Sequence, residues 1–543
     1  MITYRPSSRS DGYRKRSQTG FGGYDHRLGA SDGAIFDMKN MGSDYYPLAS
    51  PRAPRYIHDF IKVGTPKGLT GYGNIYYVDG KNLYDNDDSV GELNDATSKT
   101  FAFLGKVLVI LPDKMYYDTD TGDFGSLEAE WSGMVAFADG KFAGEQAKAC
   151  RIVSRSDDNV EFPFKVGDAV TISGAEEEAN NTTLIIREIN KDKTSICFYE
   201  NSFDLGLPED EAAEDGAESE SQTITIKRSV PDMDFICENE NRLFGCKGDT
   251  IYATKLGDPF NWNVYDGLAD DSFSVDTGSA GNFTACCSYG GYAIFFKEDR
   301  IYKLYGDKPS NFKLMSSATL GVMEGADKSV AVAGEALYYQ SRVGIMVYTG
   351  GIPSCISEVF GDVCYQKGVG GSDGLRYYVS LQDRANGKWS LFCYDTRYKT
   401  WHREDETRVI GFAYNNGLWM LTGEGKMLII GAHPLLASGM CKIEENVPSM
   451  MEFYDITESN ADKKYVNSLQ LRMMLSENAS VTVSMSFDGG EYEVVDTITD
   501  TGKTSYVVTC RLHRCDYYRI RLEGVGDYKL FALTREYSGG SER

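Results

Sequence analysis

Hydrophobic and polar residues alternate along most of this chain, and the alternation repeatedly reverses at a turn of Gly, Asp or Asn. Alternation with a period of two places successive side chains on opposite faces of a strand, and these turn residues suit tight hairpins. The pattern therefore predicts seven β-hairpins, at 72–84, 101–117, 241–252, 292–302, 336–348, 376–394 and 417–429.

The spacing of the hairpins predicts how they are arranged. Once an insertion is set aside, they recur about every 41 residues, close to the ~40–45 residues of a four-stranded propeller blade. A β-sandwich would show strands at shorter, even spacing, and no segment keeps the apolar stripe of a helix. We therefore predict an all-β protein built on a roughly seven-bladed β-propeller, formed by residues 55–134 and 229–431.

The insertion at residues 135–228 has a pattern of its own. Strand-like runs, beginning at 164–174, predict a small inserted β-barrel of the SH3-like or OB-like type. The stretch 208–221 carries only negative charge and no large apolar residue, so it has little to bury. We expect a mobile acidic loop there and the first cut by a protease.

A separate module is expected at the C-terminal end. Two prolines and a loss of alternation mark a linker at 432–450. Alternation then resumes, for example at 481–487, and continues to the end of the chain. Residues 451–543 are therefore predicted to form a C-terminal β-sandwich.

The first 54 residues form an arm whose beginning is basic. We expect residues 20–54 to pack on their own chain, where a strand could complete the last blade. Residues 1–19 are expected to reach a neighbouring subunit or connector protein, with a solvated basic tail as the alternative. The candidate residues for this partner contact are Arg5, Arg9, Arg14, Lys15 and Arg16.

The composition of the chain disfavours some classes of function. The 543 residues carry a net charge of −24 at pH 7, which disfavours nucleic-acid binding because an acidic surface repels phosphates. No apolar run is long enough to span a bilayer or to serve as a signal peptide, so we expect synthesis in a reducing cytoplasm. The 12 Cys show no C-x-x-C spacing and are expected to be buried free thiols.

Motifs that carry chemistry are sparse. The five His form no zinc-binding pair, and the Gly-rich stretch 368–374 precedes a strand rather than a phosphate-binding helix, so we expect an inter-blade loop. The turn 118–123 departs from a calcium-binding loop and is expected to be solvated, although calcium binding stays open. His513, Cys515 and Asp516 are explained equally well by a dense surface strand. We therefore predict no catalytic, cofactor-binding or metal-binding residue, no cofactor and no enzymatic activity.

Several strings of residues resemble a group of tailed-bacteriophage and prophage virion proteins. They include 241–262, 295–306, the opening 21–26 and 44–52, and the ending 514–524. The resemblance covers nearly the whole chain except the acidic loop, and extends more weakly to the nozzle and tail-stabilisation proteins of short-tailed phages. It implies a propeller that assembles as a ring, usually a hexamer, at the head–tail connector and closes or extends the DNA channel. It implies no active site.

Three functions follow as hypotheses. The first is a ring-forming tail nozzle or head–tail junction protein of the virion, which is made in the host bacterial cytoplasm. Its partners would be other tail or connector proteins, and genomic DNA would pass through it without specific binding. The alternative is a tail-tip propeller that binds a host-surface glycan or receptor. Trp262, Trp401 and Trp419 are then candidate stacking platforms, although we expect them in the core. The third is a propeller glycosidase, which needs a convergent carboxylate pair.

Overall fold

The fold is almost entirely strand. The computed structural model describes residues 12–29, 33–140, 148–155, 161–199, 203–206, 217–431, 439–459, 462–511 and 513–539. Within these ranges the helices are four single 3₁₀ turns, η1 (Glu178–Asn180), η2 (Pro309–Asn311), η3 (Asp327–Ser329) and η4 (Glu358–Phe360). None of them has the length or apolar character needed to cross a membrane.

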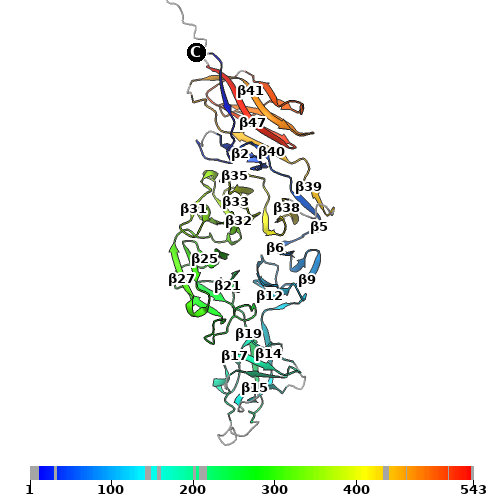
Figure 1. The fold of residues 1–543 in the computed structure, drawn as a ribbon, viewed down its shortest axis with the longest axis vertical. Helices are drawn as coiled ribbons and strands as arrows, with labels where there is room; N and C mark the ends of the chain where they lie inside the picture. The colour runs from blue at the N-terminus through cyan, green and yellow to red at the C-terminus, as the bar shows by residue number, and fades with distance from the viewer. Residues whose placement is uncertain are drawn as a thin grey trace, which may run out of the picture. The chain divides into compact units, whose positions relative to one another are not determined.

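Seven antiparallel sheets follow one another along the chain, each a meander of four strands, with a fifth strand added to the last (Figure 1). The blades are β6–β9 (Pro66–Tyr72, Asn74–Asp79, Asn82–Asp85, Asp88–Glu92), β10–β13 (Thr100–Leu104, Val107–Leu111, Met115–Asp118, Phe124–Ser126), β20–β23 (Phe235–Asn239, Arg242–Lys247, Thr250–Ala253, Phe273–Asp276), β24–β27 (Ala285–Tyr289, Tyr292–Lys297, Arg300–Tyr305, Lys313–Ala318), β28–β31 (Ala331–Ala333, Ala336–Ser341, Gly344–Tyr348, Ser354–Cys355), β32–β35 (Tyr365–Ser372, Arg376–Asp383, Trp389–Asp395, Thr400–Arg403), and β36–β38 (Val409–Tyr414, Leu418–Thr422, Lys426–Ile430) with β5 (Tyr56–Lys62) and β39 (Cys441–Ile443).

The second and third strands of each blade are the seven predicted hairpins. Most residues of these strands are buried, and β29 is buried at all six of its residues. The prediction of an all-β propeller of roughly seven blades, with an inserted barrel and a C-terminal sandwich, is confirmed.

The last blade takes its fourth strand from the N-terminal region. β5 pairs antiparallel with β38, placing Ile57 opposite Leu428, and β39 adds a fifth strand on β5. This strand was expected within residues 20–54, but it begins at Tyr56, just after the prolines that interrupt the preceding segment. Gly425, with a φ of +79°, lets this turn meet β5, since a Cβ there would lie 1.7 Å from the Val63 carbonyl oxygen.

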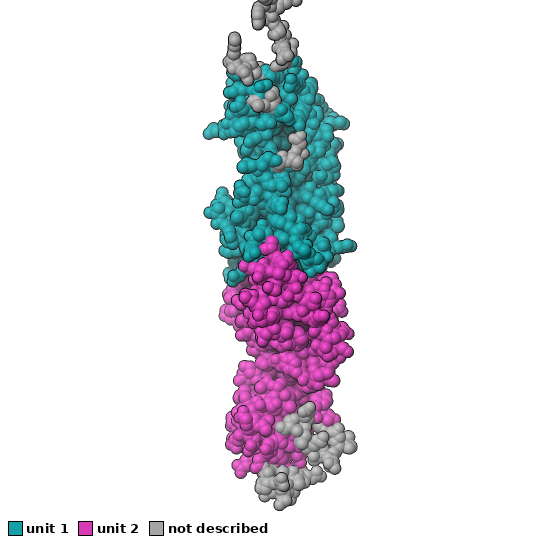
Figure 2. All heavy atoms as spheres, turned by 90° about the vertical axis from the view of Figure 1, so that its left-hand side faces the viewer, with its two compact units in different colours: residues 1–79, 85–87, 322–543 teal, residues 80–84, 88–321 magenta. Residues whose placement is uncertain are grey.

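The chain divides into two compact units, shown in different colours in Figure 2. One comprises residues 1–79, 85–87 and 322–543, and the other residues 80–84 and 88–321. Within each unit, consecutive blades pack through their first strands: β28, β32, β36 and β6 in the first, and β10, β20 and β24 in the second.

The inserted domain is a closed six-stranded barrel in the order β14-β15-β18-β17-β16-β19. Its strands are β14 (Ala129–Gly140), β15 (Lys148–Ser154), β16 (Ala169–Ser173), β17 (Thr183–Ile189), β18 (Ser195–Phe198) and β19 (Gln222–Arg228). Ala129 lies opposite Arg228, so the chain enters and leaves the barrel side by side. The barrel has its own core, including Phe137 and Ile152. Most of the acidic loop predicted at 208–221, namely residues 208–216, lies outside the described residues.

The C-terminal module is a sandwich of two sheets, in the orders β1-β47-β41-β44, with β45 on β41, and β2-β40-β46-β42-β43. Its strands are β1 (Arg14–Gln18), β2 (Ile35–Lys39), β40 (Pro448–Phe453), β41 (Lys464–Leu475), β42 (Ser480–Phe487), β43 (Glu493–Ile498), β44 (Ser505–Thr509), β45 (Arg514–Cys515), β46 (Tyr518–Val525) and β47 (Tyr528–Gly539). The inner faces bury Leu471, Val481 and Leu533 completely. Two N-terminal strands thus complete a C-terminal domain, and Figure 1 shows β2 in blue beside the later strands.

Candidate functional site

Three chain segments meet at the end of the sandwich nearest the last blades. The first, residues 41–54, contains the short ribbon of β3 (Met41–Gly42) and β4 (Ser50–Pro51), and Ala49 bridges to Leu530 of β47. The second is the connection at 444–447 between β39 and β40, and the third is the β46–β47 turn at 526–527. All three belong to the same compact unit.

A buried ion cluster fixes the floor of this region. Arg52 Nη1 lies 2.8 Å from Glu444 Oε2, and Arg52 Nε donates to Asn40 Oδ1 at 2.9 Å. Arg55, only 2% exposed, pairs through Nη2 with Glu404 and through Nη1 with Asp405 at 2.7 Å. Because buried charges persist only when paired and hydrogen-bonded, this arrangement holds the segment rigidly.

The ion cluster also shifts the pKa values of Asp405 and Arg55. Burial alone would raise the pKa of Asp405, but the Arg55 charge and the hydrogen bonds from Thr407 outweigh it, and the pKa is lowered. For Arg55, burial works toward a lower pKa, while Glu404, Asp405 and Glu444 raise it well above its ordinary value. Asp405 and Arg55 are therefore both ionised near neutral pH.

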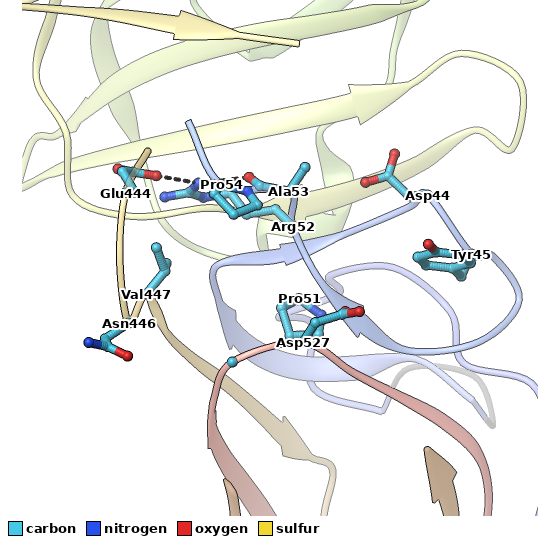
Figure 3. A pocket seen from close by; sticks show the side chains of 11 residues that line it. Asp44, Tyr45, Pro51, Arg52, Ala53, Pro54, Glu444, Asn446, Val447 and Asp527 are labelled. Carbon is cyan, nitrogen blue, oxygen red and sulfur yellow. Dashed lines mark hydrogen bonds and ion pairs between the residues drawn. The ribbon is translucent and has the colours of Figure 1, made fainter. Parts of the chain in front are cut away.

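A cavity of about 400 Å³ opens above this floor (Figure 3). Its apolar part comes from Pro51, Ala53, Pro54 and Val447. The other residues that line it are Asp44, Tyr45, Arg52, Glu444, Asn446, Gly526 and Asp527. Figure 3 shows the Arg52–Glu444 ion pair as a dashed line. A mainly apolar hollow with a few fixed polar groups is the usual form of a small-molecule site.

Tyr45 is the aromatic residue of this cavity and is 46% exposed. The Lys529 ammonium lies 3.7 Å from its ring centroid. A hydrogen bond to Tyr45 raises the pKa of Lys529, and the Asp527 charge adds to the effect, so the lysine stays cationic. The cation orders the ring from one side.

This cavity was not predicted from the sequence. Tyr45 lies in a run of two tyrosines followed by Pro47, which interrupts regular structure, and Asn446 and Asp527 carry no motif. A tyrosine close to prolines was the signal in the sequence that could have pointed to a binding site here. The partners that turn it into a cavity come from segments far away in the chain.

The predicted partner-contact residues lie at the other end of the N-terminal region. Arg5 and Arg9 lie outside the described residues. Arg14, Lys15 and Arg16 lie in β1, which pairs with β47, and Lys15 forms an ion pair with Glu536 at 2.9 Å. The structure does not bring them to the cavity, and their contact with a partner stays a prediction.

The three Trp are in the core, as expected. Trp262, Trp401 and Trp419 are at most 3% exposed. Each indole N–H donates to a backbone carbonyl, of Pro259, Ile356 and Asn415 respectively. They therefore do not serve as exposed stacking platforms.

The other sequence motifs are used structurally. Burial raises the pKa of the Cys515 thiol to about 11, which disfavours the nucleophilic thiolate, while His513 stacks on Phe487. Asp118 Oδ1 accepts the backbone N–H of Asp120 within a hairpin turn. All 12 Cys are free thiols, but only five are buried, and Cys364 is exposed.

The Gly-rich stretch 368–374 is mostly strand, not the inter-blade loop that the sequence suggested. Residues up to Ser372 lie in β32, the first strand of its blade. A Cβ on Gly371 would lie 2.4 Å from the Phe412 side chain, and one on Gly370 2.5 Å from the Ser329 carbonyl oxygen. Glycine is used here because neighbouring elements approach the first strand closely.

No family model and no curated protein matches the sequence. Several solved structures share the fold at low identity. They include the endosialidase of phage phi92, 10% identical over 73% of this chain and 73% of that one, with a TM-score of 0.25. PorZ, a surface component of the type IX secretion system of Porphyromonas gingivalis, is 11% identical over 90% and 80%, with a TM-score of 0.26. An exo-β-1,3-galactanase from Phanerochaete chrysosporium is 8% identical over 55% and 94%, with a TM-score of 0.21.

These comparisons correct one prediction. We predicted no enzymatic activity, but the endosialidase, the galactanase and a further glycoside hydrolase of similar fold are enzymes by name. The prediction of a non-enzyme is therefore wrong as an inference from this architecture, because function is determined by sites and not by the fold. Similarity this low bears on the fold alone and assigns no activity to this chain.

Proposed function

We propose that this chain is a tail component of a phage virion that binds a host-surface glycan in the cavity beside Tyr45. The observation that carries the proposal is the cavity itself, about 400 Å³ in volume, which combines an exposed aromatic ring with amide and carboxylate groups. Its floor is held by the buried Arg52–Glu444 and Arg55–Glu404 pairs.

The chemistry of the lining fits a saccharide. A sugar ring has an apolar C–H face and a rim of hydroxyls. Tyr45 offers a flat surface to the apolar face of the sugar. The Asn446 amide and the Asp527 carboxylate offer hydrogen-bonding partners to its hydroxyls. Asn446 and Asp527 are both exposed, so a ligand can reach them.

The virion assignment rests on the resemblance of the strings at 241–262 and 295–306 to phage virion proteins. None of the three solved structures named above is a tail nozzle. A ring-forming nozzle role therefore stays a prediction, and imaging of purified particles for a closed ring tests it.

The glycan proposal is tested on an array of bacterial surface polysaccharides with the full chain. We expect binding to a subset of glycans, and a loss of affinity of about fivefold or more for Tyr45→Ala, since an aromatic contact is worth ~1 kcal/mol or more. Asn446→Ala should weaken binding similarly. The same glycans are analysed for cleavage.

Tyr414→Ala is the matched control, because Tyr414 is 59% exposed on β36 and does not line the cavity. It should bind as the parent does. Absence of binding by the parent chain, or equal binding by Tyr45→Ala and the parent, contradicts the proposal.

A further inference from the structure

β1 is a short edge strand with no apolar side chain. Its sequence is Arg-Lys-Arg-Ser-Gln, and it pairs antiparallel with β47 from Arg14 opposite Tyr537 to Gln18 opposite Leu533. It lies at the edge of its sheet, and each of its residues is exposed or partly exposed.

The side-chain contacts that hold β1 are polar and lie at the surface. Lys15 pairs with Glu536 at 2.9 Å, with the lysine side chain 64% exposed. The Ser17 and Thr534 hydroxyls lie 2.8 Å apart, and Arg16 Nη1 donates to Ser459 at 3.0 Å. Detaching β1 therefore exposes little apolar surface, and its cost includes the backbone hydrogen bonds to β47 and these polar contacts.

The segment after β1 contrasts sharply with it. Phe21 and Tyr24 are 2% and 5% exposed within the core of the same unit, and the Phe21 N–H donates to the Pro47 carbonyl. Between this anchor and β1 lie only Thr19 and Gly20, both exposed, and a Cβ at Gly20 would meet no atom within 4 Å. The geometry thus provides a fixed anchor, a short free hinge and a detachable strand.

β47 needs a strand on this edge. Without β1, its backbone N–H and C=O groups between Leu533 and Tyr537 would lose their partners, and an open edge invites another strand. We propose that β1 exchanges between copies: in the assembled protein it leaves its own β47 and pairs with β47 of a second copy.

A second copy is the best-matched partner because it presents the same edge in the same register. The contacts of β1 are then conserved in either arrangement, as in other exchanges of an identical element. Charge also favours this partner. The first 18 residues carry five basic and one acidic residue, whereas the whole chain has a charge of −24. Because each copy would give one strand and receive one, repeated exchange can close into a ring.

The test joins the two positions that face each other. Ser17→Cys and Thr534→Cys are placed in one chain, where the hydroxyls 2.8 Å apart indicate that a disulfide can form. A mild oxidant, oxidised glutathione, accepts the two electrons and two protons of the thiol pair and leaves as two molecules of reduced glutathione. We expect covalent oligomers on a non-reducing gel, with the 17–534 linkage identified by peptide mass.

Two single variants with different tags are also co-expressed, one with Ser17→Cys and the other with Thr534→Cys. We expect a 17–534 linkage between differently tagged chains. The parent chain, treated in parallel, accounts for linkages through its 12 native Cys. A linkage confined within single chains at the highest soluble concentration overturns the proposal, as does the absence of any 17–534 linkage.

Discussion

At the scale of single residues, His402 shows how burial controls a charge. It lies on β35, is 5% exposed, and its Nδ1 has no hydrogen-bond partner. Burial lowers the pKa of His402 to about 4, with Asp395 and Asp44 acting in the opposite direction and Arg376 adding to the effect. The folded state therefore binds this proton less readily than the unfolded chain, whose His has a pKa of about 6.5.

This shift predicts a pH dependence of stability. As the pH falls from about 6.5 to about 4, the unfolded chain takes up the proton first, so His402 lowers the stability by about 2 kcal/mol between pH 7 and pH 5. We expect His402→Gln to remove that loss, measured by urea unfolding of parent and variant at both pH values.

His513→Gln, which replaces a partly exposed histidine of the sandwich, is measured in parallel as the control for the substitution itself. Asp25 and Asp405 have lowered pKa values, so their contribution is lost only at more acidic pH. An unchanged pH dependence in His402→Gln would show that His402 is not the responsible group.

At the scale of elements, the closing strand β5 depends on residues outside the blade that it completes. Arg55 immediately precedes the strand and reaches Glu404 and Asp405, about 350 residues away in the chain. It ties β5 to the loop between the sixth and seventh blades. The seventh blade is thus completed by the pairing of β5 with β38, and the ion cluster fixes the start of β5.

Arg55→Met should therefore destabilise the protein by about 3–5 kcal/mol, because it leaves Glu404 and Asp405 buried without their main partner. Chemical denaturation of the full chain measures this. Lys442→Ala, which removes the exposed Lys442–Asp59 pair on the same sheet, should cost less than about 1 kcal/mol. Equal effects of the two variants would mean that the cluster adds nothing beyond a surface pair.

At the scale of the whole molecule, the inserted barrel is a domain within the second unit. All six strands close on one another, and residues such as Phe137 and Ile196 form a core of their own. Its outward contacts include hydrogen bonds with Asn261, which donates to Asp168 and accepts the Ala169 N–H, and cation–π contacts of Lys165 and Arg228 with the Phe260 ring.

We expect residues 127–230, expressed alone, to fold and to unfold cooperatively on heating, since the barrel leaves no open sheet edge and its ends lie side by side. Circular dichroism and the dispersion of amide NMR signals measure this. Asn261 belongs to the neighbouring blade, so Asn261→Ala in the full chain should leave the barrel core intact. A fragment without cooperative unfolding would show that the barrel depends on its host propeller.

The sequence by itself determined the elements that depend on neighbouring residues. Each predicted hairpin joins two strands through a turn of a few residues, so alternation and turn chemistry suffice, as in 292–302 between β25 and β26. The repeat length then predicted the propeller, and the break in the repeat predicted the inserted barrel.

Only the tertiary structure decided the long-range pairings. Ile57 meets Leu428, and β1 joins β47, through backbone hydrogen bonds that leave no mark in either local sequence. The cavity has the same origin: Tyr45, Asn446 and Asp527 come from three distant segments, and each alone is an ordinary surface residue. Backbone pairing is nearly independent of residue identity, so the partner of an edge is set by which edges remain open once the domains have packed.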